Sequence, residues 1–126
     1  MAKDKYQPTP TELEILQVLW KEGASTVRFI NDELNKTKKV GYTSTLKIMQ
    51  LMAEKGILER EPQGKSHLYS PTIKEEDTQN TLLDKFLNST FKGSASKLIM
   101  AALGNYNPDA SELEEIKDFI SKMENK

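Results

Sequence analysis

The sequence contains no cysteine, and its 126 residues include only one histidine and one tryptophan. Without cysteine the chain can form neither a disulfide framework nor a thiolate zinc site, and it has no cysteine nucleophile. The one histidine, His67, has no carboxylate cluster near it, which makes it a poor metal ligand or catalytic base. We therefore expect no metal site and no cofactor.

Long apolar runs are also missing. The first residues are polar and charged, and they lack the apolar run of roughly 7–15 residues that a secretory signal needs. No later segment approaches the roughly 20 apolar residues of a membrane-spanning helix, so we expect a cytoplasmic protein. There is no nucleophile paired with a base, no glycine-rich phosphate loop and no cluster of liganding side chains, and we expect no enzyme.

A surplus of charge of either sign is missing as well, because the net charge is −1 and the pI is about 5.9. Nucleic-acid-binding domains usually have a basic surplus, and the average charge therefore counts against this class. Residues 1–72, however, contain 11 lysines and arginines against 9 acidic residues, whereas residues 73–126 contain 7 against 10. The positive charge leans slightly toward the N-terminal part.

Helical patterns fill the first part of the chain. Thr11 is expected to cap a first amphipathic helix, in which Trp20 is a core residue and which Gly23 ends. A short second helix over residues 27–34 is expected to be capped by Ser25 or Thr26. A third helix is expected to begin at residue 42 and to end near residue 56.

The third helix is followed by a hairpin pattern. Within the helix, Thr45, Ile48, Met49 and Met52 are spaced to face inward. Residues 57–61 and 66–70 are typical of two short strands around a turn at residues 62–65. Three helices and a hairpin predict a mainly α fold of the α+β winged-helix kind, with a winged helix-turn-helix DNA-binding domain over residues 1–72.

Residues 73–126 are expected to form a helical dimerisation domain. After a turn-like charged segment at residues 72–77, helical patterns occur at about residues 78–91, 94–104 and 111–123. So short a segment cannot enclose its many apolar residues alone, and we expect them to meet a second copy of the chain. The residues expected at this dimer contact are Leu83, Phe86, Leu87, Leu98, Ile99, Leu103, Ile116, Phe119 and Ile120.

The outer face of the third helix holds the candidate base-reading residues. In a helix-turn-helix domain the second helix of the motif enters the major groove, and its N-terminal residues meet base edges. Thr43 and Ser44 can bond a base or a phosphate, Lys47 can reach guanine, and Gln50 can pair with adenine. A merely solvated helix face is the alternative, and the following hairpin favours DNA.

Phosphate contacts are expected around the same helix. Basic and hydroxyl side chains before it and at the hairpin tip suit the salt-dependent, sequence-independent part of DNA binding. Such lysines are also common as solvated loop residues. The residues assigned to phosphate contact are Thr26, Lys38, Lys39, Tyr42, Lys65, Ser66 and His67.

Several short motifs point to a known family when they are taken together. They are Pro10-Thr11-Glu12-Leu13-Glu14-Ile15-Leu16, Tyr42-Thr43-Ser44-Thr45, Glu54-Lys55-Gly56-Ile57-Leu58 and Tyr69-Ser70-Pro71. With them, residues 8–123 resemble the penicillinase-repressor family of bacterial winged-helix regulators, the BlaI, MecI and CopY type. The resemblance implies a homodimer that binds a palindromic operator DNA upstream of resistance or stress genes and blocks transcription.

The resemblance also implies roles for particular positions in the DNA-binding part. The family's base-reading positions fall on Thr43, Ser44 and Lys47. Its basic position one turn later falls on Leu51, which is not basic. The operator sequence is therefore expected to differ from those of the familiar members.

Control by proteolysis is implied by the penicillinase branch of the family. There, a membrane sensor protease cuts the repressor within the second C-terminal helix, and the corresponding positions are Ala101 and Ala102. A nearby Asn105-Tyr106 pair is expected to lie in a loop. The copper-responsive branch has a cysteine metal hook, which the absence of cysteine excludes.

A winged-helix module that binds another protein is the alternative function, because this fold does not by itself settle function. The slightly acidic average charge favours a protein-binding module. The polar start of the third helix favours DNA.

Overall fold

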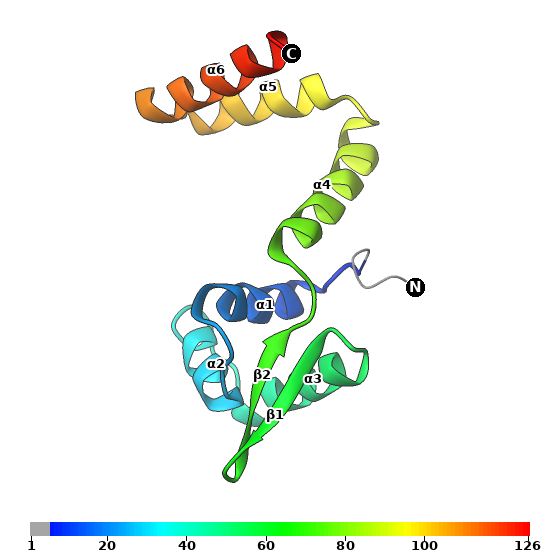
Figure 1. Cartoon of the computed structure of the whole chain (residues 1–126), viewed down its shortest axis with the longest axis vertical. Helices are drawn as coiled ribbons and strands as arrows, with labels where there is room; N and C mark the ends of the chain where they lie inside the picture. Colours follow the sequence, from blue (N-terminus) through cyan, green and yellow to red (C-terminus); the bar gives the residue numbers. More distant parts are fainter. Residues whose placement is uncertain (1–5) are drawn as a thin grey trace. The chain divides into compact units, whose positions relative to one another are not determined.

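The computed structural model describes residues 6–126. The elements of this part, in chain order, are α1 (Pro10–Glu22), α2 (Val27–Leu34), α3 (Tyr42–Glu54), β1 (Leu58–Gln63), β2 (Ser66–Pro71), α4 (Glu75–Phe91), α5 (Ala95–Tyr106) and α6 (Ala110–Glu124) (Figure 1). The chain divides into two compact units between Leu83 and Asp84, inside α4. Within residues 6–126 no helix is long and apolar enough to cross a membrane.

Helix α1 begins earlier than the sequence pattern predicted, because Thr9 and not Thr11 is its cap. The Thr9 hydroxyl accepts a hydrogen bond from the backbone N–H of Glu12 (3.2 Å), and the Glu12 carboxylate accepts one from the N–H of Thr9 (2.9 Å). This reciprocal pair is a capping box. Pro10 follows the cap at the first helical position, where its missing N–H needs no partner. The prediction of Thr11 was therefore wrong.

The caps of α2 and α3 follow the sequence more closely. Of the two candidates for α2, Thr26 is the cap, and its hydroxyl accepts a hydrogen bond from the N–H of Phe29 (3.1 Å). Helix α3 starts at Tyr42, as predicted, and Gly56 follows its end with a φ of 80°. Such a left-handed residue suits glycine because it has no Cβ.

One continuous core holds the N-terminal unit together. It is formed by one face of each of the first three helices, by the base of the hairpin and by Ile73 just after the hairpin. Trp20 lies at its edge and donates a hydrogen bond from its indole N–H to the carbonyl of Ile73 (3.0 Å). The buried apolar residues are Ile15, Leu16, Leu19, Val27, Ile30, Leu34, Met49, Met52, Ile57, Leu58, Tyr69 and Ile73.

Strands β1 and β2 form an antiparallel hairpin that extends away from helices α1, α2 and α3 (Figure 1). The pairing runs from Leu58 opposite Pro71 to Gln63 opposite Ser66, which leaves a two-residue tip of Gly64 and Lys65. Gly64 has a φ of 60°, and a positive φ at the first loop position is typical of the tight turns that match strand twist. The strands are thus longer, and the turn shorter, than the sequence predicted.

The base of the hairpin is fixed to the start of α2. Ser25 exchanges two backbone hydrogen bonds with Tyr69, at 3.0 and 2.8 Å. Three helices and this anchored hairpin make the N-terminal unit a winged helix, as the sequence predicted.

Two boundaries in the C-terminal part differ from the sequence-based expectation. Helix α4 already begins at Glu75, because three acidic residues in its first turn favour the helix N-terminus. Helix α5 continues through Asn105 and Tyr106, which were expected in a loop. The side-chain amide of Asn105 donates to the carbonyl of Ala101 (2.8 Å), and the left-handed Asn107, with a φ of 44°, then ends the helix.

Candidate nucleic-acid interface

The four predicted base-reading residues lie on the outer face of α3. Thr43, Ser44, Lys47 and Gln50 are all exposed, while the opposite face buries Thr45, Met49 and Met52. Residues three and four positions apart on a helix are neighbours on its surface. The structure therefore brings these side chains together on one polar face that starts at the helix N-terminus.

A buried hydrogen bond holds α3 against α2. The side-chain amide of Asn31, in α2, donates to the hydroxyl of Thr45 (2.8 Å) and to the carbonyl of Val40 (3.2 Å). Asn35 adds a second bond to the Val40 carbonyl (2.8 Å). Sequence reasoning missed Asn31, although a polar residue among Val27, Ile30 and Leu34 on the inward face of α2 was a visible signal.

A groove of about 310 Å³ lies between α2, α3 and the hairpin. It collects five of the seven residues predicted to contact phosphate, and they come from three separate elements. The residues that line it are Thr26, Val27, Arg28, Tyr42, Leu46, Gln50, Lys65, Ser66, His67 and Tyr69. Hydroxyl and cationic side chains of this kind suit the oxygens of a DNA backbone.

Arg28 is a member of this groove that sequence reasoning missed. Its guanidinium carbon lies 4.8 Å from the centre of the Tyr42 ring, which is a cation–π arrangement. The contact places a permanent positive charge beside the first residue of α3. The pairing joins residues far apart in the sequence, and only the packing of α2 against α3 reveals it.

The other two predicted phosphate contacts lie outside this groove. Lys38 forms an ion pair with Glu14 of α1, with 2.5 Å between Nζ and Oε1. Lys39 is exposed in the loop before α3. Part of the positive charge of this loop is thus engaged with α1.

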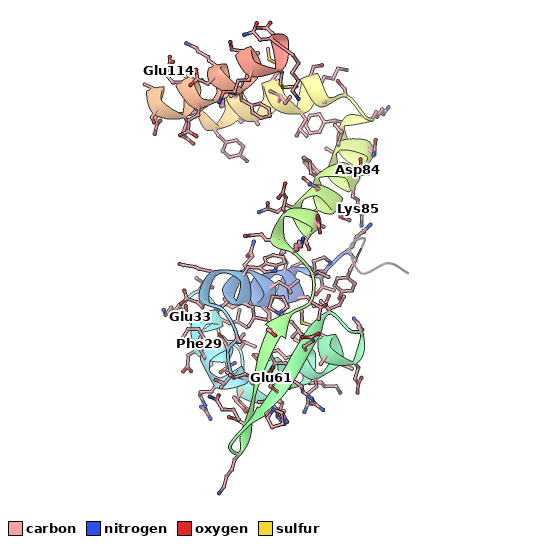
Figure 2. The ribbon with its side chains drawn as sticks, in the orientation of Figure 1. Phe29, Glu33, Glu61, Asp84, Lys85 and Glu114 are labelled. Atoms are coloured by element: carbon pink, nitrogen blue, oxygen red, sulfur yellow. The ribbon has the colours of Figure 1, made fainter. Side chains whose placement is uncertain are left out.

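Nearer the C-terminal end of α3, beyond Gln50, the charge beside the helix is reversed. A second hollow, of about 740 Å³, is lined by α3 and β1 and contains Glu54, Glu59 and Glu61 with a single cation, Arg60. Figure 2 shows Glu61 on the hairpin. Carboxylates repel phosphate. The charge distribution therefore favours a DNA backbone on the side of Arg28 and Lys65.

The C-terminal end of α3 is tied to α1 through a buried carboxylate. Glu12 accepts hydrogen bonds from the Tyr6 hydroxyl, from the N–H of Thr9 and from Lys55 Nζ, at 3.2 Å for Lys55. Burial alone raises the pKa of Glu12, but these three donors outweigh it and lower that pKa below its ordinary value. Burial and the bond to Glu12 raise the pKa of Tyr6.

The residues predicted for the dimer contact lie on three helices. Leu83, Phe86 and Leu87 are in α4, and Leu98, Ile99 and Leu103 are in α5, as are Ala101 and Ala102. Ile116, Phe119 and Ile120 are in α6. No residue of α5 or α6 is buried in the single chain.

Comparison with known proteins agrees with this geometry. The sequence pattern of the family described as penicillinase repressor matches residues 8–122. The chain is 24% identical over 120 residues to the penicillinase repressor of Bacillus licheniformis, a match that covers 95% of this chain and 94% of that protein.

Two solved structures are also similar. The DNA-binding domain of the repressor BlaI is 32% identical, and that match covers 56% of this chain and 87% of the domain, with a TM-score of 0.49. The complex structure of hsRosR-S4 is 18% identical and covers 97% of this chain and 94% of that one, with a TM-score of 0.53; it supports the fold alone. Because the family pattern spans both units, the chain belongs to the penicillinase repressor family.

Proposed function

We propose that this chain is a DNA-binding transcriptional repressor that binds a palindromic operator as a homodimer, with α3 in the major groove. The observation that carries the proposal is the polar outer face of α3 beside a groove of hydroxyl and cationic side chains. Thr43, Ser44, Lys47 and Gln50 read base edges. The repressors of the family are not enzymes in general, and this function requires only binding.

The protein groove between α2, α3 and the hairpin supplies the contacts to DNA phosphates. Arg28, Tyr42 and Thr26 face the backbone beside the N-terminus of α3, and Lys65, Ser66 and His67 follow it along the hairpin. Together they set the depth and direction of α3 in the groove of the DNA. Lys38 and Lys39 add charge on the flank of the loop.

The homodimer is supported by the exposed apolar side chains of the C-terminal helices. Ile99 is 53% exposed, Phe119 66% and Ile120 48%. An apolar surface this extensive is unusual for a monomer and typical of an interface. A second copy presents the same surface, and a two-fold dimer matches a palindromic operator.

Induction by a membrane sensor protease is part of the proposal. A cut in α5 at Ala101–Ala102 separates α6, with its share of the dimer contact, from the DNA-binding unit. A chain that ends at Ala101 should therefore sediment as a monomer and lose operator binding. If that truncated chain remained a tight dimer on the operator, proteolytic induction would be excluded.

Selection of bound duplexes from a random DNA library, at two salt concentrations, tests the function directly. We expect a palindromic consensus that persists at the higher salt. A repressor-type protein prefers its operator over random DNA by a factor on the order of a thousand or more. Recovery of no consensus, with weak binding that salt abolishes, would instead favour the protein-binding module.

Lys47→Ala separates base reading from general charge. We expect this variant to lose affinity for the selected operator by about tenfold or more while its affinity for random DNA changes little. Lys21→Ala, which removes an exposed lysine from the last turn of α1, is the matched control and should leave both affinities nearly unchanged. If Lys47→Ala left the ratio of operator affinity to random-DNA affinity unchanged, base reading by Lys47 would be contradicted.

A further inference from the structure

One apolar side chain interrupts the polar outer face of α3. Leu51 is 43% exposed. The other aliphatic residues of α3 are buried in the core or packed against its edge, and Leu51 is not part of that cluster. Those core-facing residues are Leu46, Ile48, Met49, Met52 and Ala53. The interior of the protein therefore does not account for the leucine at this position.

Leu51 lies in line with the candidate base-reading residues. It follows Ser44 by seven positions and Lys47 by four, and both spacings bring side chains onto the same stripe of a helix. Four residues correspond to about 6 Å along the helix axis. A helix that inserts Ser44 and Lys47 into the major groove therefore carries Leu51 along the same groove, about two base-pair steps further on.

The chemistry of the major groove restricts what a leucine can contact there. Of the groups that base pairs expose in this groove, the C5-methyl of thymine is the apolar one, and the others donate or accept hydrogen bonds. A leucine pressed against those polar groups would remove their water without replacing its hydrogen bonds, which is costly. Against a methyl group it buries apolar surface on both sides.

We propose that Leu51 determines operator specificity by packing against the methyl group of a thymine in each half-site. This inference rests on the proposed DNA-binding function and adds one residue and one base to it. The thymine lies about two base pairs from the base that Lys47 contacts.

Replacement of thymine by deoxyuridine tests the contact, because it removes only the methyl group. We expect the full-length protein to bind the selected operator about fourfold more weakly for each half-site substituted at the critical position, and about fifteenfold more weakly for both. Substitution at thymines elsewhere in the operator should have no such effect.

Two variants assign the effect to Leu51. Leu51→Ala should bind the thymine and deoxyuridine operators equally well, and Leu51→Gln should shift the selected base at this position toward adenine. Phe29→Ala is the matched control. Phe29, labelled in Figure 2, is an exposed apolar residue of α2. It lines a different hollow, with Glu22 and Ala24, and its removal should keep the preference for thymine.

The outcomes separate this inference from the function beneath it. A clear consensus with no thymine near the Lys47 position, or with equal affinity for deoxyuridine, would overturn the role of Leu51 and leave the repressor intact. Loss of thymine preference in both Leu51→Ala and Phe29→Ala would also overturn it. If the wild-type chain selects no consensus at all, the proposed function fails and this inference fails with it.

Discussion

Glu12 shows how one side chain can serve both a helix end and the tertiary structure. It completes the capping box of α1 and also receives Lys55 from the end of α3 and the hydroxyl of Tyr6. Glu12 is only 6% exposed, and the hydrogen bonds to its carboxylate are stronger because they are charge-assisted. Helix α3, which carries the proposed base-reading residues, is thereby fixed to α1 at its C-terminal end.

Glu12→Gln should destabilise the protein by about 1–3 kcal/mol at neutral pH, because a neutral amide accepts these bonds more weakly and brings a donor without a partner. The measurement is urea unfolding of the full chain. Glu14→Gln is the control, since Glu14 and its partner Lys38 are both more than a third exposed, and such pairs contribute little. If Glu12→Gln and Glu14→Gln lowered the free energy of unfolding equally, the structural role of Glu12 would be contradicted.

The lowered pKa of Glu12 also predicts a pH dependence. Because the folded-state pKa lies below that of the unfolded chain, the ionised carboxylate stabilises the fold fully above the ordinary pKa of 4.5. This stabilisation is lost as the pH falls through the folded-state pKa. Between pH 7 and pH 3, the free energy of unfolding should therefore fall less for Glu12→Gln than for the wild type.

Contacts between individual side chains were the hardest feature of this protein to predict from its sequence. Ser44 and Lys47 could be placed on an outer face because helical periodicity alone decides it. Arg28 against Tyr42 and Asn31 against Thr45 could not be foreseen, since each depends on the packing angle of α2 and α3. Local spacing determines faces, but it does not determine which side chains meet across two elements.

At the level of elements, the hairpin is the part to which we assign much of the sequence-independent DNA binding. Its tip carries Lys65 after Gly64, and its base is bonded to Ser25. The strands were predictable from two short segments on either side of a glycine-containing turn. Their full length was not, because Pro62 suggested a turn although a proline is tolerated in an edge strand.

Lys65→Ala should weaken binding to operator and to random DNA by similar factors, because a phosphate contact carries no base information. It should also reduce the slope of log affinity against log salt by about 0.9 per contact, hence about 2 for a dimer. Binding titrations at several salt concentrations measure this slope. An unchanged slope would show that the tip does not touch the backbone, and Lys21→Ala serves again as the control.

The ends of the helices were also difficult to predict from the sequence. Helix α4 begins before the point where apolar periodicity becomes visible, and α5 runs past Gly104 to Tyr106. Acidic first turns and side-chain bonds such as that of Asn105 to Ala101 extend helices into segments that lack a hydrophobic pattern. Periodicity locates helices well and their termini poorly.

At the level of the whole molecule, the two units contrast in how they bury apolar surface. The N-terminal unit has a closed core, whereas α5 and α6 leave all their residues at least partly exposed in the single chain. Composition indicated this contrast, because residues 73–126 hold too many apolar side chains for so short a segment.

Phe119→Asp should convert the full-length protein from dimer to monomer at micromolar concentration, because it places a charge in an apolar contact. Sedimentation velocity measures the change, and operator affinity should fall with it. Ser121→Asp adds the same charge at an exposed polar position of α6 and should remain dimeric. A dimeric Phe119→Asp protein would show that α6 lies outside the interface.

The absence of buried residues in α5 and α6 bears on how long repression lasts. If two copies supply each other's core as proposed, a chain that loses its partner keeps a folded DNA-binding unit but exposes an unprotected helical tail. Cellular proteases act fastest on such loosely held segments. Separated chains would then be removed before they could pair again, so a brief inducing signal would have an effect that outlasts it until new protein is synthesised.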